Sequence, residues 1–253
     1  MEVEIMLFDK NKKDEVKNVN TVLTNAAFTQ LHVKLTDLDL AVVSGDHFEI
    51  RYRGAEDKKP SVTQTGDAIE LKEPKVERRN GKIWQKKLIK VELVTTDDIG
   101  KVTVVIPKDH KLNQLDVDLT SGDAKMQDLL LNDLKYSSAS GDLKIETVQV
   151  QKLKIEVTSG DVKLRDVGVS TGKIDLISGD FKMEDSNISD NLTVATTSGD
   201  NVVENTEVDQ CDLSTVSGDN SIFGGQNTHA QIGKEINGSH LKMSTLSGDN
   251  TVR

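Results

Sequence analysis

The sequence predicts an all-β protein, specifically a single-stranded parallel β-helix or β-solenoid with coils of about 19 residues. Three features of the 253-residue chain predict this fold class. A Ser-Gly-Asp tripeptide recurs at a nearly fixed period, apolar and polar residues alternate between its copies, and aromatic residues make up only 3% of the chain. Alternation with a period of two is typical of strands that bury one face. A fixed period is typical of stacked coils, whose interior small and β-branched side chains can fill.

The Ser-Gly-Asp tripeptide sets the period of the array. From Ser121 onward, successive copies are 19, 19, 19, 20, 19 and 30 residues apart. Glycine supplies the positive φ of a sharp corner, and Ser and Asp side chains bond nearby backbone N–H groups where a strand bends. The predicted structural turn residues are therefore Gly45, Asp46, Gly122, Asp123, Gly141, Asp142, Gly160, Asp161, Gly179, Asp180, Gly199, Asp200, Gly218, Asp219, Gly248 and Asp249.

Each unit also carries three apolar positions that we expect to face the interior. The first follows the repeat aspartate by three residues, the second lies five residues further on, and the third lies near the end of the unit. One unit cannot bury its own apolar face, so neighbouring coils must cover it. We expect two short strands per coil, with equivalent side chains in columns about 4.8 Å apart. One such column contains Ile145, Leu164 and Met183.

The row of repeat aspartates has two interpretations, a structural turn or a calcium site. Lysine follows the aspartate by two residues in four units and should share its outward face, which reduces like-charge repulsion. These lysines are Lys125, Lys144, Lys163 and Lys182. Calcium-binding β-rolls use glycine-rich nonapeptides whose additional carbonyls complete the ligand shell. Each turn here has one glycine and one acid, so the pattern favours a structural turn and no cofactor. A calcium-stabilised surface protein is the alternative.

The charge of the chain excludes one class of partner. Its 42 acidic and 32 basic residues give a net charge of −10, and residues 121–253 alone hold 21 acids and 12 bases. Nucleic-acid binding needs basic surface to replace counterions around phosphate, so no nucleic acid is expected as a partner. Cys211 is the only cysteine, so no intrachain disulfide can form. The sequence contains neither a spanning apolar run nor a signal peptide, so by itself it leaves the location open.

A basic segment at residues 72–90 interrupts the pattern. It has eight basic residues and the only tryptophan, and its Asn80-Gly81 pair is typical of a type I′ hairpin. A hairpin projecting from the rod could contact anionic lipid headgroups or wall polymers. A solvated hairpin whose tryptophan packs on the solenoid is the alternative. The candidate binding residues are Arg78, Arg79, Lys82, Trp84, Lys86 and Lys87.

No catalytic residues are predicted. The histidines show no metal-ligand spacing, and Cys211 has no evident histidine partner. Some β-helical enzymes cleave polysaccharides with carboxylates grouped on one sheet face, but such sites need long loops to wall a cleft. The coils from Ser121 to Val216 allow only tight corners, which argues against an enzyme. A β-helical carbohydrate-active enzyme is kept as an alternative.

The ends and the longest unit complete the expected organisation. Residues 1–27 should form an N-terminal strand or cap and linker, residues 28–120 irregular coils, and residues 121–253 regular coils. Residues 224–239, within the 30-residue unit, are expected to be an excursion at a coil corner. Only four residues follow Asp249, so we expect an exposed C-terminal coil and a homodimer through the solenoid ends.

Two segments resemble the bacterial putative adhesin family DUF4097. The run KVTVVIPKDHKLNQLDVDLTSGD, Lys101 to Asp123, matches the family's apolar-Ile-Pro strand followed by its glycine-aspartate repeats. The run FTQLHVKLTDLDLAVVSGDHFEIRYRG, Phe28 to Gly54, resembles its opening segment. The resemblance spans about residues 28–253.

The resemblance implies a β-helical, non-catalytic interaction scaffold of the bacterial cell envelope, linked to envelope-stress sensing. It implies an envelope protein or a cell-wall or membrane-surface component as partner, and a cell-surface or envelope location. The family has no established catalytic residues, so none is transferred to this chain.

Overall fold

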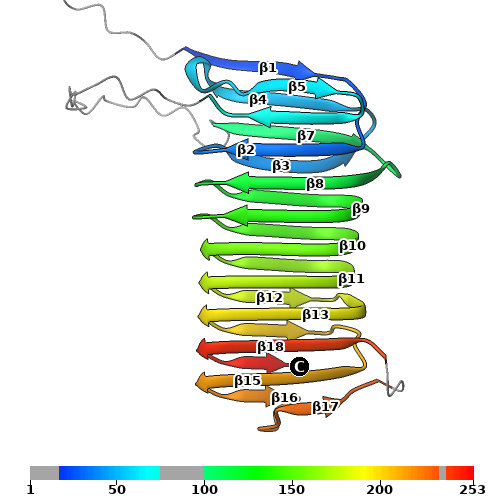
Figure 1. Ribbon diagram of the computed structural model, residues 1–253, viewed down its shortest axis with the longest axis vertical. Helices are drawn as coiled ribbons and strands as arrows, with labels where there is room; N and C mark the ends of the chain where they lie inside the picture. The colour runs from blue at the N-terminus through cyan, green and yellow to red at the C-terminus, as the bar shows by residue number, and fades with distance from the viewer. Residues whose placement is uncertain (1–16, 75–99, 234–237) are drawn as a thin grey trace, which may run out of the picture.

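The computed structural model describes residues 17–74, 100–233 and 238–253, and these residues form a rod of stacked strands (Figure 1). Apart from the 3-10 turn Glu56–Lys58, every regular element in these ranges is a strand. The predicted β-solenoid is therefore confirmed. The first eight strands are β1 (Asn18–Thr24), β2 (Gln30–Leu35), β3 (Asp39–Gly45), β4 (Glu49–Ala55), β5 (Ser61–Thr65), β6 (Ala68–Lys72), β7 (Lys101–Pro107) and β8 (Lys111–Leu119).

The remaining strands make the regular part of the rod. They are β9 (Ala124–Ser138), β10 (Leu143–Ser159), β11 (Val162–Ser178), β12 (Phe181–Glu184), β13 (Asn187–Ser198), β14 (Asn201–Glu204), β15 (Gln210–Ser217), β16 (Asn220–Ile222), β17 (His229–Gln231), β18 (His240–Ser247) and β19 (Asn250–Val252). Successive coils pair in parallel, with Ile145 opposite Leu164 and Leu164 opposite Met183. All three side chains are buried, so the predicted column is confirmed.

Each regular coil has three straight runs, whereas the sequence suggested two short strands. In β10 the buried residues are Leu143 and Ile145, then Val148 and Val150, then Leu153 onward. The buried positions change from odd to even and back to odd because the strand bends twice. Thr147 takes a left-handed φ of 53° at the first bend, and residues 151–152 are both exposed at the second. We call these stretches the first, second and third runs of a coil.

Glycine at the Ser-Gly-Asp corner is required both by conformation and by space. Gly160 has a φ of 139°, a region that residues with a Cβ rarely adopt. A Cβ there would lie 2.2 Å from the carbonyl oxygen of Gly141 in the next coil. The corners of successive coils can therefore stack at strand spacing only because neither glycine carries a side chain.

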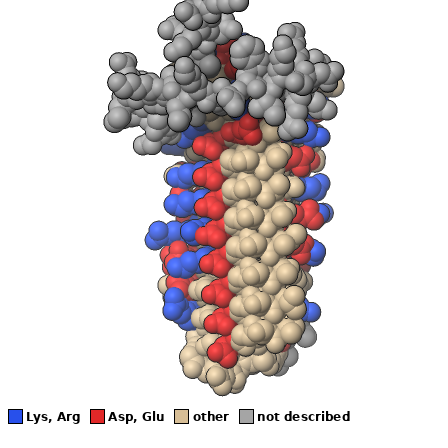
Figure 2. Space-filling view, turned by 90° about the vertical axis from the view of Figure 1, so that its left-hand side faces the viewer, with Lys and Arg blue, Asp and Glu red and all other residues tan. Residues whose placement is uncertain are grey.

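The repeat aspartates form a hydrogen-bonded ladder along this corner. The backbone N–H of Asp142 donates to Oδ1 of Asp123 at 2.9 Å, and Asp161 donates to Asp142 in the same way. At the bend, the side-chain Oδ1 of each aspartate thus accepts a backbone N–H that a backbone carbonyl would accept in a regular strand. Figure 2 shows the acidic side chains as a continuous column with basic side chains along one edge. In stacking order the ladder contains Asp39, Asp123, Asp142, Asp161, Asp180, Asp200, Asp249 and Asp219.

The ladder begins at Asp39, and the predicted turn at Gly45 and Asp46 does not join it. Gly122 stacks on Leu38, so residues 37–39 occupy the corner of that coil although they lack the tripeptide. Strands β2 and β3 lie between β6–β7 on one side and β8–β9 on the other. The earliest coil of the solenoid is therefore inside the stack. Beyond it, β4 pairs antiparallel with β1 and β7, and β5 pairs antiparallel with β6.

The C-terminal coil is also inside the stack, contrary to the expectation that it is exposed. Strand β18 pairs with β13 on one side and with β15 on the other, as Figure 1 shows. Three asparagines, of which Asn201 and Asn250 are fully buried, fix the position of this inserted coil. Asn201 donates to Asn250, and Asn250 donates to Asn220, each at 2.8 Å. The end of the rod is therefore formed by β15 and β16 rather than by the chain terminus.

The residues expected to form a simple excursion partly cover that end. Strand β17, within residues 224–239, pairs antiparallel with Gln210–Asp212 of β15. His229 on β17 and His240 on β18 both contact the Asp212 carboxylate, at 2.6 and 2.8 Å. The three neighbouring strands are thereby linked through one side chain. The long unit gives the chain enough length to cover β15 and then return to the position beside β13.

Candidate functional site

The outward side chains of the first run form ion pairs. Glu146 contacts Lys144 at 2.8 Å and Lys125 of the preceding coil at 3.0 Å. These two lysines lower the pKa of Glu146, with Lys144 as the larger cause. The lysines were expected to face the repeat aspartates, but Lys163 and Asp161, 3.6 Å apart, are the one such pair within the described ranges. The other paired lysines contact glutamates because a glutamate stands beside them on the same run.

The third run is charged in the same manner. Lys154 contacts Glu156 at 2.9 Å, and Lys173 contacts Asp175 in the next coil at 2.5 Å. Each pair lies two residues apart on one strand, where both side chains point outward. Exposed pairs of this kind contribute little stability, but they keep both faces hydrated and electrically balanced.

The second run differs from both. Its outward positions in four consecutive coils are Leu130, Gln149, Gly168 and Asn187, none of which is charged. Lys111 precedes this column and Glu207 follows it. Leu130 is 37% exposed, which makes it one of the few exposed large aliphatic side chains in the described ranges. The middle of the second face is therefore a neutral strip on a rod whose other two faces carry ion pairs.

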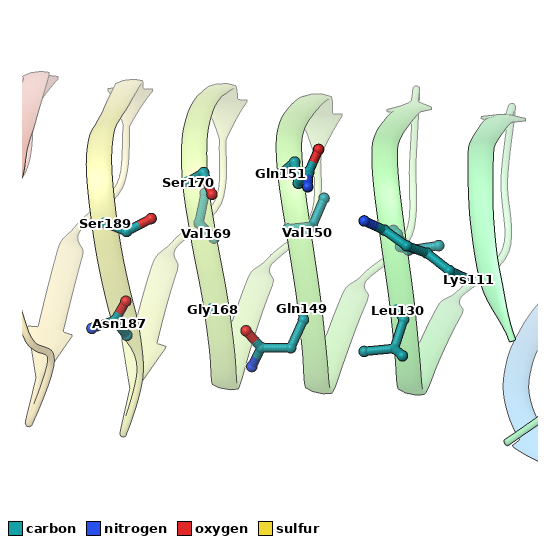
Figure 3. A pocket seen from close by; sticks show the side chains of 11 residues that line it. Lys111, Leu130, Gln149, Val150, Gln151, Gly168, Val169, Ser170, Asn187 and Ser189 are labelled. Carbon is teal, nitrogen blue, oxygen red and sulfur yellow. The ribbon is translucent and has the colours of Figure 1, made fainter. Parts of the chain in front are cut away.

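This neutral strip is the floor of a groove. Three hollows of about 290, 510 and 350 Å³ overlap along it: Gln149 lines all three, Leu130 lines the first two, and Gly168 and Asn187 line the first and the third. One wall follows the left-handed bend and contains Asp128, Thr147, Asp166 and Asp185. The opposite wall follows the next bend and contains Gln151, Ser170 and Ser189. Figure 3 shows this second wall and the floor across successive coils. We refer to the whole feature as the second-run groove.

Gly168 leaves a space on the floor that the Gln149 carboxamide occupies. A Cβ at this position would lie 2.0 Å from Oε1 of Gln149, whose side chain extends across the glycine in Figure 3. The clash would be with the far end of a flexible side chain and not with backbone, and Gly168 does not have a positive φ. Unlike the corner glycines, Gly168 is therefore not required for folding. Its small size leaves room for the Gln149 carboxamide to lie across the floor.

The groove was not anticipated from the sequence. Aligned repeats do show the signal, because the outward residue of the second run is uncharged in four successive units. That signal predicts a groove only after the structure has shown that the second run forms a separate face of the rod. The candidate binding residues Arg78, Arg79, Lys82, Trp84, Lys86 and Lys87 lie outside the described residues.

Within the described ranges, no group of three or more His, Cys, Asp or Glu side chains has an arrangement that could hold a metal ion. The row of repeat aspartates is included in that statement. Cys211 is buried within the end coil, on β15, and burial raises the pKa of its thiol. No helix among these residues is long and apolar enough to cross a membrane.

Comparison with known proteins identifies one family. The family model described as Toastrack DUF4097 matches residues 28–253. A putative cell adhesion protein from Clostridium sporogenes has 12% identity and a TM-score of 0.37, over 93% of this chain and 98% of its own. A putative adhesin from Bacteroides fragilis has 14% identity and a TM-score of 0.47, over 94% of this chain and 97% of its own. None of the curated proteins matches the chain.

Proposed function

The chain belongs to the Toastrack DUF4097 family, and from this premise we propose that it is a non-catalytic interaction scaffold of the bacterial cell envelope. The observation that carries the proposal is the second-run groove. It combines a neutral floor with polar walls on a rigid rod, while the other two faces are covered by exposed ion pairs. A rod of this kind can present a binding strip repeated from coil to coil. A link to envelope-stress sensing is the finer proposal, suggested by the resemblance alone.

The test is retention of the full chain by isolated bacterial envelope fragments. We expect wild type to sediment with the fragments and Gly168→Leu to remain largely in the supernatant, because leucine displaces the Gln149 carboxamide and places an apolar side chain at the centre of the floor. The matched control is Lys154→Leu, which places the same side chain at an outward position of the third run. Failure of wild type to sediment would count against the scaffold proposal. Equal retention of all three proteins would exclude the groove as the contact surface.

The basic segment at residues 72–90 is a second proposed contact surface. It rests on composition, because eight basic residues surround the only tryptophan. Trp84→Ala and charge reversal at Arg78 and Arg79 should each weaken retention if the segment binds anionic headgroups or wall polymers. Unchanged retention in these variants, beside a loss in Gly168→Leu, would assign binding to the groove alone.

Carbohydrate cleavage is the rival activity, and the arrangement of the groove disfavours it. Glycosidic cleavage by an acid pair needs carboxyl groups on both sides of the scissile bond. In the second-run groove, Asp128, Asp166 and Asp185 lie on one wall, and the opposite wall carries amide and hydroxyl groups. A panel of polysaccharides incubated with the chain should yield no shortened product, and release of oligosaccharide would overturn the non-catalytic proposal.

Calcium stabilisation is the other rival. Oδ1 of the repeat aspartates already accepts backbone N–H groups, which leaves one oxygen of each carboxylate for any ion. We expect the melting temperature to be the same with calcium and with a chelator. A rise with calcium that the chelator reverses would favour the calcium-stabilised alternative.

A second copy of the chain is the proposed partner at the free end of the rod. Strand β17 covers β15 only along Gln210–Asp212, and Val216 beyond it is 78% exposed. An uncovered strand edge without lysine or proline is suited to pairing with another strand. Light scattering over a dilution series should show a dimer that Val216→Lys reduces to a monomer. A strict monomer at high wild-type concentration would count against it.

A further inference from the structure

We infer that a basic pocket near the β1 end of the rod binds the phosphate group of a phosphate ester. Asn20 of β1, Arg51 and Arg53 of β4, and Lys101 and Thr103 of β7 line this hollow, whose volume is about 210 Å³. Strand β4 pairs with both β1 and β7, at the top of the rod in Figure 1. We refer to the hollow as the cap pocket. The inference goes beyond the proposed function, because the cap pocket shares no lining residue with the second-run groove.

The side chains of the cap pocket gather because they alternate with buried ones. Tyr52 and Val102 are buried in the core, so the residues on either side of each point outward. The antiparallel register then places Arg53 of β4 between Asn20 of β1 and Lys101 of β7. Hydrogen-bond donors on three neighbouring strands therefore converge on one hollow.

The Arg51 guanidinium is held in a fixed orientation. Its Nε and one terminal nitrogen donate to the two carboxylate oxygens of Glu49, at 2.7 and 2.9 Å, and its other terminal nitrogen donates to Oδ1 of Asn20 at 3.3 Å. Each terminal nitrogen carries two N–H groups, so one on each remains for a ligand. The Asn20 amide nitrogen is a further donor. An oriented guanidinium loses less side-chain entropy when it binds an anion.

Two cations face each other in the cap pocket. Arg53 and Lys101 stand directly opposite each other on adjacent strands, an arrangement of like charges that costs stability. An anion between them converts this repulsion into two attractions. Two acids flank the pocket without lining it. They are Glu49, whose oxygens accept the N–H groups described above, and Asp39, opposite Lys101 on β3, whose Oδ1 accepts a backbone N–H.

The volume and the direction of the donors favour phosphate. A hollow of about 210 Å³ is smaller than the about 300–1,000 Å³ of sites that enclose a whole drug-sized ligand, so it suits one small group of a larger molecule. A phosphate ester presents oxygens in several directions, which matches donors that come from three strands. A carboxylate has two oxygens in one plane and suits a single guanidinium, as in the Glu49–Arg51 pair.

The experiment is calorimetric titration of the full chain with inorganic phosphate and with glycerol 1-phosphate. We expect both to bind, and added salt to weaken the binding. The double variant Arg53→Gln, Lys101→Gln should lose at least about tenfold in affinity, because it removes two charge-assisted contacts. The matched control Lys154→Gln, Lys173→Gln removes the same charge from the third run and should bind like wild type. Gly168→Leu should also bind like wild type, because its substitution lies in the second-run groove.

Two further measurements distinguish the sources of the phosphate. Soluble poly(glycerol phosphate) represents a wall polymer, and vesicles of phosphatidylglycerol in phosphatidylcholine represent a lipid headgroup. Binding to either that is lost in the Arg53→Gln, Lys101→Gln variant supports the inference and identifies the source. Binding to either that this variant retains in full would count against the cap pocket as the contact.

Three results would overturn the inference. They are absence of wild-type binding to both small phosphates, an equal loss of affinity in the two double variants, and binding of the carboxylate galacturonate as tightly as glycerol 1-phosphate. Circular dichroism of the Arg53→Gln, Lys101→Gln variant must match wild type. If that variant does not fold, Thr103→Val provides the test, because it removes one hydroxyl donor from an outward position. It should weaken phosphate binding, and unchanged affinity would overturn the inference.

Discussion

The corner glycines should be far more sensitive to substitution than the groove glycine, and Gly160→Ala against Gly168→Ala tests this directly. Both changes add one methyl group, at the corner that precedes β11 in Gly160→Ala and within β11 in Gly168→Ala. At Gly160 the backbone has a φ of 139° and the new Cβ would lie 2.2 Å from a backbone oxygen. At Gly168 the φ is not positive, and the new Cβ meets only the end of the Gln149 side chain.

The expected difference follows from these two environments. A non-glycine residue forced into an unfavourable backbone region costs about 1–3 kcal/mol. Relief of the clash with Gly141 must also lengthen hydrogen bonds between these two corners, such as that from Gly141 N–H to the Ser159 carbonyl, each contributing about 0.5–1.5 kcal/mol. Gly160→Ala should therefore lose about 2–4 kcal/mol. Gly168→Ala should change stability by less than about 1 kcal/mol, and a gain is expected because glycine weakens strands.

The assay is equilibrium unfolding in urea, followed by circular dichroism. With a slope of about 2–3 kcal/mol per molar urea, the midpoint of Gly160→Ala should fall by about 1 M, while that of Gly168→Ala stays close to wild type. Equal losses in both variants, or an unchanged midpoint for Gly160→Ala, would refute the argument that close stacking of corners requires glycine.

Three other expectations concern the ladder, the inserted coil and the end of the rod. Asp161→Asn keeps an oxygen that can accept the Asp180 N–H, so its free energy of unfolding, measured in urea, should stay within about 0.5 kcal/mol of wild type. Asp161→Ala removes the acceptor and should lose about 0.5–1.5 kcal/mol. Equal losses would show that the charge matters more than the hydrogen bond. Deletion of residues 240–253 removes the coil between β13 and β15, so hydrogen exchange should show loss of protection in β15; protection retained there would contradict the topology. Hydrogen bonds from His229 and then from His240 lower the pKa of Asp212. The contact between Asp212 and these histidines therefore stabilises the end of the rod fully above the ordinary aspartate pKa of about 3.9. This stabilisation is lost as the pH falls through the lowered pKa. Exchange in β17 should therefore accelerate on acidification relative to Asp212→Asn at the same pH, and identical profiles would argue against this role.

The columns of the interior could be predicted because alternation and a fixed period are local properties of the sequence. Ile145, Leu164 and Met183 share a position in the repeat, and parallel in-register pairing follows from stacking. The first bend of the coil was harder to recognise. Its residue, Thr147, takes a left-handed conformation without being glycine. The sequence signal for this bend was that the apolar positions change from odd numbers, ending at Ile145, to even numbers, beginning at Val148.

The order of the coils could not be predicted from spacing. A 30-residue interval is compatible with an inserted loop or with a displaced coil, and only long-range pairing distinguishes them. The sequence does contain a hint, since Asn201, Asn220 and Asn250 each follow the tripeptide directly. In the structure these three asparagines form one hydrogen-bonded ladder. An asparagine at the same position in all three units indicated that their coils are neighbours, but not that the last coil lies between the other two.

The candidate site also could be recognised only from the three-dimensional arrangement of the coils. Gln149, Gly168 and Asn187 are unremarkable polar or small residues in the sequence. They become a feature only when the second run is a separate face and its neutral strip is compared with the ion pairs beside it. The basic segment around Trp84 was conspicuous in the sequence, and its role stays a prediction.

The most direct test of the account is side-chain footprinting of the full chain by hydroxyl radicals, with and without bacterial envelope fragments. Leu130 on the groove floor and Ile177 on the third run are both exposed aliphatic residues, at 37% and 57%. If the second-run groove is the contact surface, the fragments should protect Leu130 from oxidation and leave Ile177 unchanged. Protection of Ile177 with Leu130 unaffected, or equal protection of both, would contradict the account.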